Sequence, residues 1–145
     1  MQQTIKLYEL KKIQSEFPKS KIRSSADAAE FIRQFYSDDI DIFESSFILL
    51  LNRANDTIGY AKISQGGITG TVVDPRLVAK YAVESLSPCV ILAHNHPSGN
   101  LTPSGADKDL TDKIKKGLKL LDIDLLDHII LTNESYYSLS ENGDM

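Results

Sequence analysis

The sequence contains only one cysteine, Cys89, among its 145 residues. A single cysteine excludes an internal disulfide bond and any zinc site built on a C-x-x-C pair, and it is typical of a reducing compartment. Cys89 opens the apolar run CVILA. We therefore expect it to be a small residue of the hydrophobic core rather than a nucleophile.

Long apolar runs and an excess of positive charge are also missing. No stretch approaches the roughly 18 apolar residues of a membrane-spanning helix, and the N-terminus lacks the apolar centre of a signal peptide. We therefore expect a cytoplasmic protein without membrane contacts. Lys and Arg number 16 against 20 Asp and Glu, for a formal charge of −4. This balance does not favour a large nucleic-acid-binding surface.

The composition is that of one globular domain, with 41% hydrophobic and 25% charged residues. Residues 1–23 are interpreted as an N-terminal arm and residues 24–145 as the domain. Within the arm, residues 4–10 alternate well enough to form a short strand. Such a strand could pair at a sheet edge of this chain or of a second copy, so a homodimer is one possible assembly.

Alternating helical and strand patterns predict an α/β fold, in which a mixed sheet carries helices on both faces. Ser24 or Ser25, Asp74 with Pro75, and Ser104 provide start signals for three helices. The helices are predicted at residues 24–40, 74–86 and 104–121, the strands at 46–52, 57–64, 89–93, 125–131 and 136–140, with a glycine-rich turn at 65–70 and a short strand at 71–73. The strand at 89–93 is apolar throughout, as expected for a central strand, and functional residues of such sheets gather at strand ends.

The loop after that strand begins with His94 and His96. In an extended chain two residues at i and i+2 share a face, while Asn95 points away and can bond the loop backbone. Pro97 then helps to turn the chain, and Asp107 follows on the first turn of the next helix. Two imidazoles and one carboxylate are typical of a catalytic zinc site, in which water takes the fourth position.

Other interpretations of the same residues remain open at this point. Ser104 and Asp107 have the spacing of a capping box, so Asp107 could serve only the helix N-terminus. The letters His-Asn-His also suggest a nuclease, but those enzymes spread the three residues over a ββα unit. A zinc deaminase requires the pattern H-x-E…P-C-x-x-C. Here His96 stands where that pattern has Glu, and the second cysteine is absent.

The string His94-x-His96-x₇-Ser104-x₂-Asp107 resembles the JAMM motif of the MPN (JAB) metalloprotease family. The surrounding segments DPRLV, VILAHNHPSGNLTPSGADKDLT and LLDHIIL are similar to the RadC-like branch of that family, over roughly residues 20–140. The resemblance implies a cytidine-deaminase-like MPN/JAMM domain with Zn²⁺ bound by His94, His96 and Asp107. It also implies that Ser104 holds a developing oxyanion.

The resemblance further implies a glutamate that acts as general acid and base. Glu44, just before the first strand of the sheet, matches this role best, and Glu30 and Glu84 are weaker candidates. We expect His128, within LLDHIIL, to be packed and hydrogen-bonded rather than a ligand. Its neighbour Asp127 is a candidate to form a hydrogen bond with a metal-binding imidazole, as carboxylates often do.

The implied activity is that of a zinc-dependent metallopeptidase or isopeptidase, which hydrolyses an amide bond of an unidentified peptide substrate. The alternative is a RadC-type accessory module in DNA repair without peptidase activity of its own. RadC proteins usually carry a helix-hairpin-helix region before this domain, and residues 1–23 offer no room for it. Nucleic-acid binding is therefore not carried over. A metal-free scaffold is disfavoured because all three ligand positions are kept.

Overall fold

We describe the fold from a computed structural model that covers residues 2–66 and 72–145. The elements are α1 (Ser25–Arg33), the 3₁₀ helix η1 (Asp38–Asp41), β1 (Ser45–Leu51), β2 (Thr57–Gln65), α2 (Pro75–Glu84), β3 (Cys89–Asn95), α3 (Gly105–Lys119), β4 (Asp124–Leu131) and β5 (Tyr136–Ser138). The glycine-rich turn and short strand that the sequence suggested at 65–73 fall mostly outside the described residues.

The strands form one mixed sheet in the order β2-β1-β3-β4-β5. β3 lies at its centre, antiparallel to β1 and parallel to β4. The two outer pairs, β1 with β2 and β4 with β5, are antiparallel. All seven residues of β3 are buried, so its side chains contribute to the core on both faces, as the apolar run predicted.

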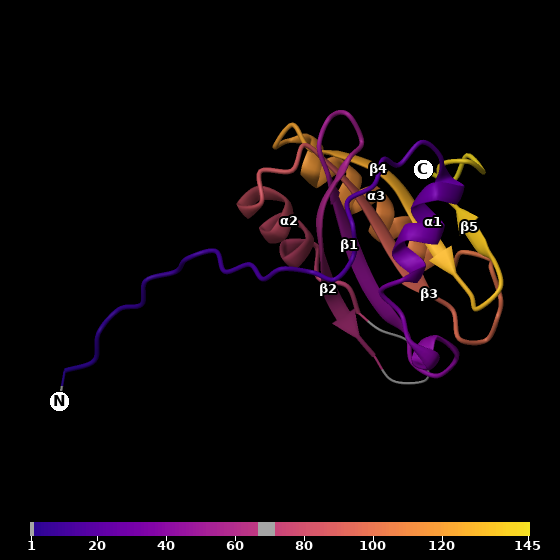
Figure 1. The fold of residues 1–145 in the computed structure, drawn as a ribbon, viewed down its shortest axis with the longest axis horizontal. Coiled ribbons are helices and arrows are strands. Elements are labelled where there is room, and N and C mark those ends of the chain that lie inside the picture. Colours follow the sequence, from indigo (N-terminus) through magenta and orange to yellow (C-terminus); the bar gives the residue numbers. More distant parts are fainter. Residues whose placement is uncertain (1, 67–71) are drawn as a thin grey trace.

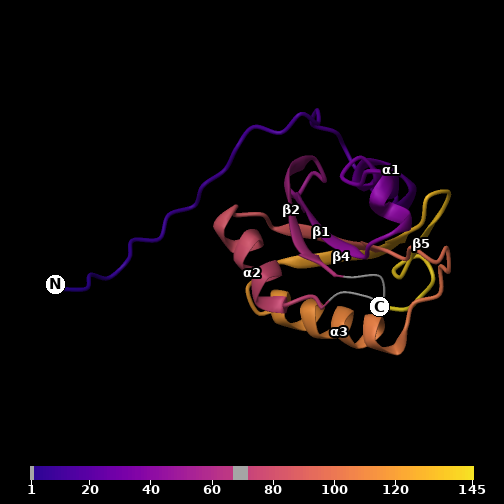
Figure 2. The ribbon, with the colours of Figure 1, turned by 90° about the horizontal axis from the view of Figure 1, so that it is seen from below.

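Helices cover both faces of this sheet (Figures 1 and 2). On one face α1 packs against alternate residues of β1, β3 and β4, with Ala29 and Ile32 fully buried. On the other face α2 and α3 pack against the intervening residues, through Val78, Ala82 and Ile114 among others. The predicted α/β class with a mixed sheet between helices is confirmed. Cys89 lies in the first of these two cores, 5% exposed, as expected.

The N-terminal segment differs from the prediction, because residues 4–10 form no strand. They run as an extended chain away from the body of the molecule (Figure 1). Ile5 is 99% and Tyr8 87% exposed. A strand requires a hydrogen-bonded neighbour, and in the described residues the first sheet-like pairing of the chain is the bridge between Lys21 and Asp56. Near the end of the arm Phe17 packs against the body, with its ring 5.5 Å from that of Phe35.

Several predicted boundaries also move, and two of these changes are informative. The first helix ends at Arg33 rather than at residue 40, and Asp38 and Asp39 instead begin η1. Acidic residues are unfavourable at a helix C-terminus, where the dipole is negative, and favourable at the start of a new turn. β3 continues through Asn95, two residues beyond its predicted end. The first imidazole of the motif is therefore part of the sheet.

Within the described ranges, no helix combines the length and the apolar character needed to cross a membrane.

Asp127 is a buried acidic residue that ties three elements together. Its side chain accepts hydrogen bonds from the hydroxyls of Ser25 and Ser138 and from the backbone N–H groups of His128 and Ser140, at 2.7–3.1 Å. These partners place the carboxylate on the α1 side of the sheet. Four donors compensate for removing the charge from water. The suggestion that Asp127 forms a hydrogen bond with a metal-binding imidazole is therefore wrong.

Replacement of Asp127 by Ala should lower the free energy of unfolding by about 2–4 kcal/mol, because it leaves buried donors without an acceptor. Urea unfolding monitored by circular dichroism measures this change. Asp109→Ala, at an exposed carboxylate of α3, is the matched control and should change stability by less than about 0.5 kcal/mol. Equal effects of the two substitutions would contradict the role given to Asp127.

Candidate metal centre

The candidate metal centre lies where β3 leaves the sheet. His94 is paired with Ser46 of β1 on one side and with Ile130 of β4 on the other. The backbone N–H of His96 continues this pattern by donating to the carbonyl of Leu131 at 2.9 Å. Both histidines are therefore held by the sheet, and their i, i+2 spacing directs both rings to the face that carries α3.

Asn95, between the two histidines, points to the opposite face and is fully buried. Its Oδ1 accepts from the N–H of Ser45, and its Nδ2 donates to the carbonyls of Ile40 and Phe43, at 2.7–2.8 Å. The expectation that Asn95 points away from the histidines is confirmed, but its side chain bonds the backbone around Glu44 and not that of its own loop. The bonded residues flank Glu44, so Asn95 fixes the backbone from which that glutamate projects.

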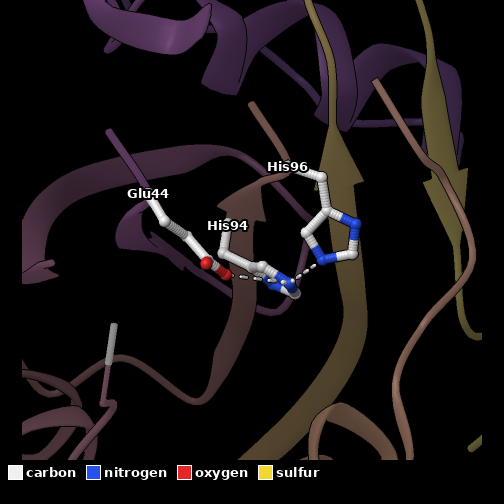
Figure 3. Close-up of side chains that lie close together, drawn as sticks. All are labelled: Glu44, His94 and His96. Atoms are coloured by element: carbon white, nitrogen blue, oxygen red, sulfur yellow. Dashed lines mark hydrogen bonds and ion pairs between the residues drawn. The ribbon is translucent and has the colours of Figure 1, made fainter. Parts of the chain in front are cut away.

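Four side chains that the sequence singled out meet at this point. The Nε2 atoms of His94 and His96 are 2.9 Å apart. Asp107 approaches both rings, with Oδ1 3.5 Å from Nε2 of His94 and Oδ2 3.6 Å from Nε2 of His96. Oε1 of Glu44 lies 3.8 Å from Nε2 of His94, and this His stands between Glu44 and His96 (Figure 3).

These separations suit a single small cation. With metal–ligand distances of about 2.0 Å, the donor atoms of a tetrahedral site lie roughly 3.3 Å from one another. The observed spacings of 2.9–3.8 Å bracket that value. Glu44, His94 and His96 present donor atoms that all fall within 4.8 Å of one another, and Asp107 contacts the same two rings. The nitrogen and oxygen donors also match those that Zn²⁺ takes in catalytic sites.

Asp107 serves its helix and the imidazoles at the same time. It forms the capping box with Ser104: its N–H donates to Oγ of Ser104 at 3.0 Å, and its Oδ2 accepts from the N–H of Ser104 at 2.9 Å. A carboxylate has about four lone-pair positions, so the cap does not exhaust it. Burial alone would raise the pKa of Asp107. Contacts with His94, His96 and Ser104 outweigh burial and hold that pKa well below its usual range.

The tautomer of His96 is fixed by its second ring nitrogen. Nδ1 lies 2.6 Å from the backbone carbonyl of Asn100, which can only accept, so Nδ1 carries the hydrogen. Nε2 then presents a lone pair toward His94. The carboxylate of Asp107 raises the pKa of His96 and the Asn100 carbonyl adds to this effect, against the opposing effect of burial.

The remaining candidates lie as follows. Ser104 is the exposed N-cap of α3. Glu30 is paired with Arg33 on α1, across the sheet from the imidazoles, and Glu84 is paired with Lys80 at the end of α2. Glu44 is therefore the one of the three candidate glutamates whose carboxylate reaches His94.

Two further residues, His128 and Thr111, extend the hydrogen bonding from His94. His128 is 1% exposed, and its Nε2 is 2.7 Å from Nδ1 of His94. It is packed and hydrogen-bonded, as expected. Burial lowers its pKa well below the usual range, and the charge on a protonated His94 acts in the same direction. Thr111, which the sequence did not single out, contacts the other nitrogen of His128. The available signal was its position four residues after Asp107, one helical turn along α3.

Comparisons with known proteins agree with this geometry. A family model described as the RadC-like JAB domain matches residues 22–144. A UPF0758 protein of Flavobacterium johnsoniae is 45% identical over 123 residues, which are 85% of this chain and 53% of that protein. UPF0758 protein YfjY of Escherichia coli is 43% identical over 100 residues, 69% of this chain and 62% of that protein. The chain thus spans about half to three fifths of these relatives' length.

Replacement of His96 by Ala should abolish retention of zinc, because His94 would be the one imidazole left beside the two carboxylates. Elemental analysis of the purified, zinc-loaded protein measures this loss, and circular dichroism checks that the fold is kept. Asp109→Ala should retain the zinc content of the unchanged protein. Equal zinc in the His96 variant would contradict the site.

The affinity for Zn²⁺ should fall as the pH is lowered, since each imidazole must lose its proton to bind the metal. A raised pKa means that His96 keeps its proton to a higher pH than a free imidazole does. Affinity should be constant above that pKa and should fall about tenfold per pH unit for each competing proton below it. Competition with a chromophoric chelator between pH 8 and pH 5 measures the dependence. An unchanged affinity over this range would argue against imidazole ligands.

Proposed function

Because the chain belongs to the RadC-like JAB domain family, we propose that it is a zinc-dependent hydrolase of amide bonds, a peptidase or isopeptidase. The observation that supports this proposal is the convergence of two imidazoles and two carboxylates at the end of the central strand. Two imidazoles and one carboxylate suffice as ligands of a catalytic zinc. The second carboxylate is then available for proton transfer.

His94, His96 and Asp107 are the proposed ligands. Asp107 contacts both rings through its two oxygens, whereas Glu44 has its ion-pair contact with His94. Asp107 also belongs to the first turn of a 15-residue helix and is held there by its capping box. When bound, zinc would polarise the scissile carbonyl and lower the pKa of a water molecule toward 7.

Glu44 is the proposed general acid and base. Its side chain is 18% exposed, so it borders both the site and solvent, and the bonds from Asn95 to Phe43 and Ser45 hold its backbone. Oε1 lies 3.8 Å from Nε2 of His94, close enough to accept a proton from a water that a bound metal would hold. The same carboxylic acid can then donate that proton to the leaving amine.

Ser104 is the proposed donor to the oxyanion of the tetrahedral intermediate. Its Oγ already accepts a hydrogen bond from the N–H of Asp107, and a hydroxyl that accepts can still donate its own hydrogen. Ser104 is exposed and stands three residues before the proposed ligand Asp107. A donor preset in this way stabilises the charge that develops on the carbonyl oxygen.

Glu44→Gln should retain zinc but hydrolyse amide bonds at least about 100-fold more slowly, because the amide cannot take the proton of the water. Asp107→Asn should lose zinc and activity together. A zinc-loaded sample incubated with a complex peptide mixture, with new termini counted by mass spectrometry, measures hydrolysis. Elemental analysis measures zinc in the same samples.

Glu30→Gln, at an exposed carboxylate of α1, is the control and should behave as the unchanged protein. If the Glu44 variant lost zinc and the Asp107 variant kept it, Glu44 would be the ligand and Asp107 the general acid and base, contrary to the proposal. No new termini from the zinc-loaded protein, with the metal stably bound, would overturn the proposed peptidase activity.

A further inference from the structure

A chain of buried hydrogen bonds leads from the metal centre into the core. Nδ1 of His94 is 2.7 Å from Nε2 of His128, and Nδ1 of His128 is 2.6 Å from Oγ1 of Thr111. Oγ1 of Thr111 in turn lies 2.7 Å from the backbone carbonyl of Asp107. His128 is 1% exposed and Thr111 is fully buried, so water cannot substitute for these partners.

The direction of every hydrogen bond in this chain follows from its last member. The carbonyl of Asp107 can only accept, so Thr111 donates its single hydroxyl hydrogen to it. Oγ1 of Thr111 must then accept from His128, which places the hydrogen of His128 on Nδ1. Nε2 of a neutral His128 is left with a lone pair and accepts from Nδ1–H of His94. The lone pair of His94 consequently lies on Nε2, which faces the Nε2 lone pair of His96 at 2.9 Å, so this arrangement is complete only with a cation bound by both nitrogens.

The opposite placement of the ring hydrogens is excluded by the same donors and acceptors. A neutral His128 with its hydrogen on Nε2 would direct the lone pair of Nδ1 at Oγ1 of Thr111. The hydrogen of that hydroxyl is already committed to the Asp107 carbonyl. Two lone pairs at 2.6 Å in a buried position repel each other, and unpaired buried polar atoms destabilise the fold. His94 would also carry its hydrogen on Nε2, where it could not bind a metal.

We propose that His128 and Thr111 are positioning residues that hold His94 in the single tautomer able to bind the metal. The inference rests on the proposed metal site but not on the proposed hydrolysis. The helix that brings in the carboxylate of Asp107 also supplies, one turn later, the hydroxyl that orients His94. One hydrogen-bonded chain thereby links β3, β4 and α3 and ties the ring of His94 to the backbone of the helix that carries Asp107.

The affinity for Zn²⁺ tests this proposal without any assay of hydrolysis. His128→Leu removes the acceptor behind His94 and should weaken binding about 10–100-fold, the usual effect of losing the partner of a ligating histidine. His128→Gln offers an amide oxygen toward His94 and an amide nitrogen toward Thr111, so it should restore binding to within about threefold. Thr111→Val should weaken binding about tenfold, and Thr111→Ser should not.

Thr57→Val is the matched control, since Thr57 is also a buried threonine whose hydroxyl forms a hydrogen bond, here with the N–H of Ser20. It lies at the start of β2, at the opposite end of the sheet from the histidines. Urea unfolding of each variant separates lost stability from lost affinity. Thr57→Val should lower stability as Thr111→Val does but leave the affinity for Zn²⁺ unchanged.

Nitrogen-15 NMR of the histidine rings provides a second readout, which remains available if a His128 variant does not fold. In the zinc-loaded, unchanged protein at pH 8, His94 and His128 should both carry their hydrogen on Nδ1. A hydrogen on Nε2 of His94, or equal losses of affinity in the Thr111→Val and Thr57→Val variants, would overturn the proposal. Failure of the unchanged protein to bind Zn²⁺ would instead overturn the metal site and the proposed function with it.

Discussion

The structure depends on the alternation of side chains along a β-strand, applied at the end of β3. His94 and His96 face α3, and Asn95 between them faces the α1 side. Because β3 is central, both neighbours fix its register, and a shift of one residue would exchange the two faces. Three consecutive residues thereby direct two imidazoles to one side and, from the other, hold the backbone of Glu44, the proposed general base.

The sequence left open whether Asp107 caps its helix or faces the imidazoles, and the start of α3 shows that it does both. The capping box and the contacts with the imidazoles occur together, because Oδ2 meets the N–H of Ser104 while Oδ1 faces His94. A helix N-terminus favours a negative charge, so the cap helps to keep the carboxylate ionised for a cation. A feature that explains local structure is thus compatible with a role in metal binding.

Sequence reasoning anticipated the class of fold and the residues that meet at the site, and it missed features set by contacts between distant elements. The spacing of His94 and His96 is local, so strand geometry sufficed to predict that the rings share a face. The contact of Thr111 with His128 and the position of Asp127 on the α1 side depend on which helix packs on which face of the sheet. The spacing of residues in the sequence does not give this information. The strand expected at residues 4–10 failed because alternation describes a strand without supplying its neighbour.

The segment that joins His96 to Ser104 holds its histidine through the main-chain oxygen of residue 100 and not through a side chain. Every amino acid has that oxygen, so the contact with the ring depends on the path of the backbone and not directly on the side chain of residue 100. Gly99, with φ at 85°, is the residue that the turn itself demands. The side chains of Ser98 and Asn100 instead accept hydrogen bonds from the N–H groups of Asn100 and Thr102, so they shape the turn that carries this oxygen to the ring.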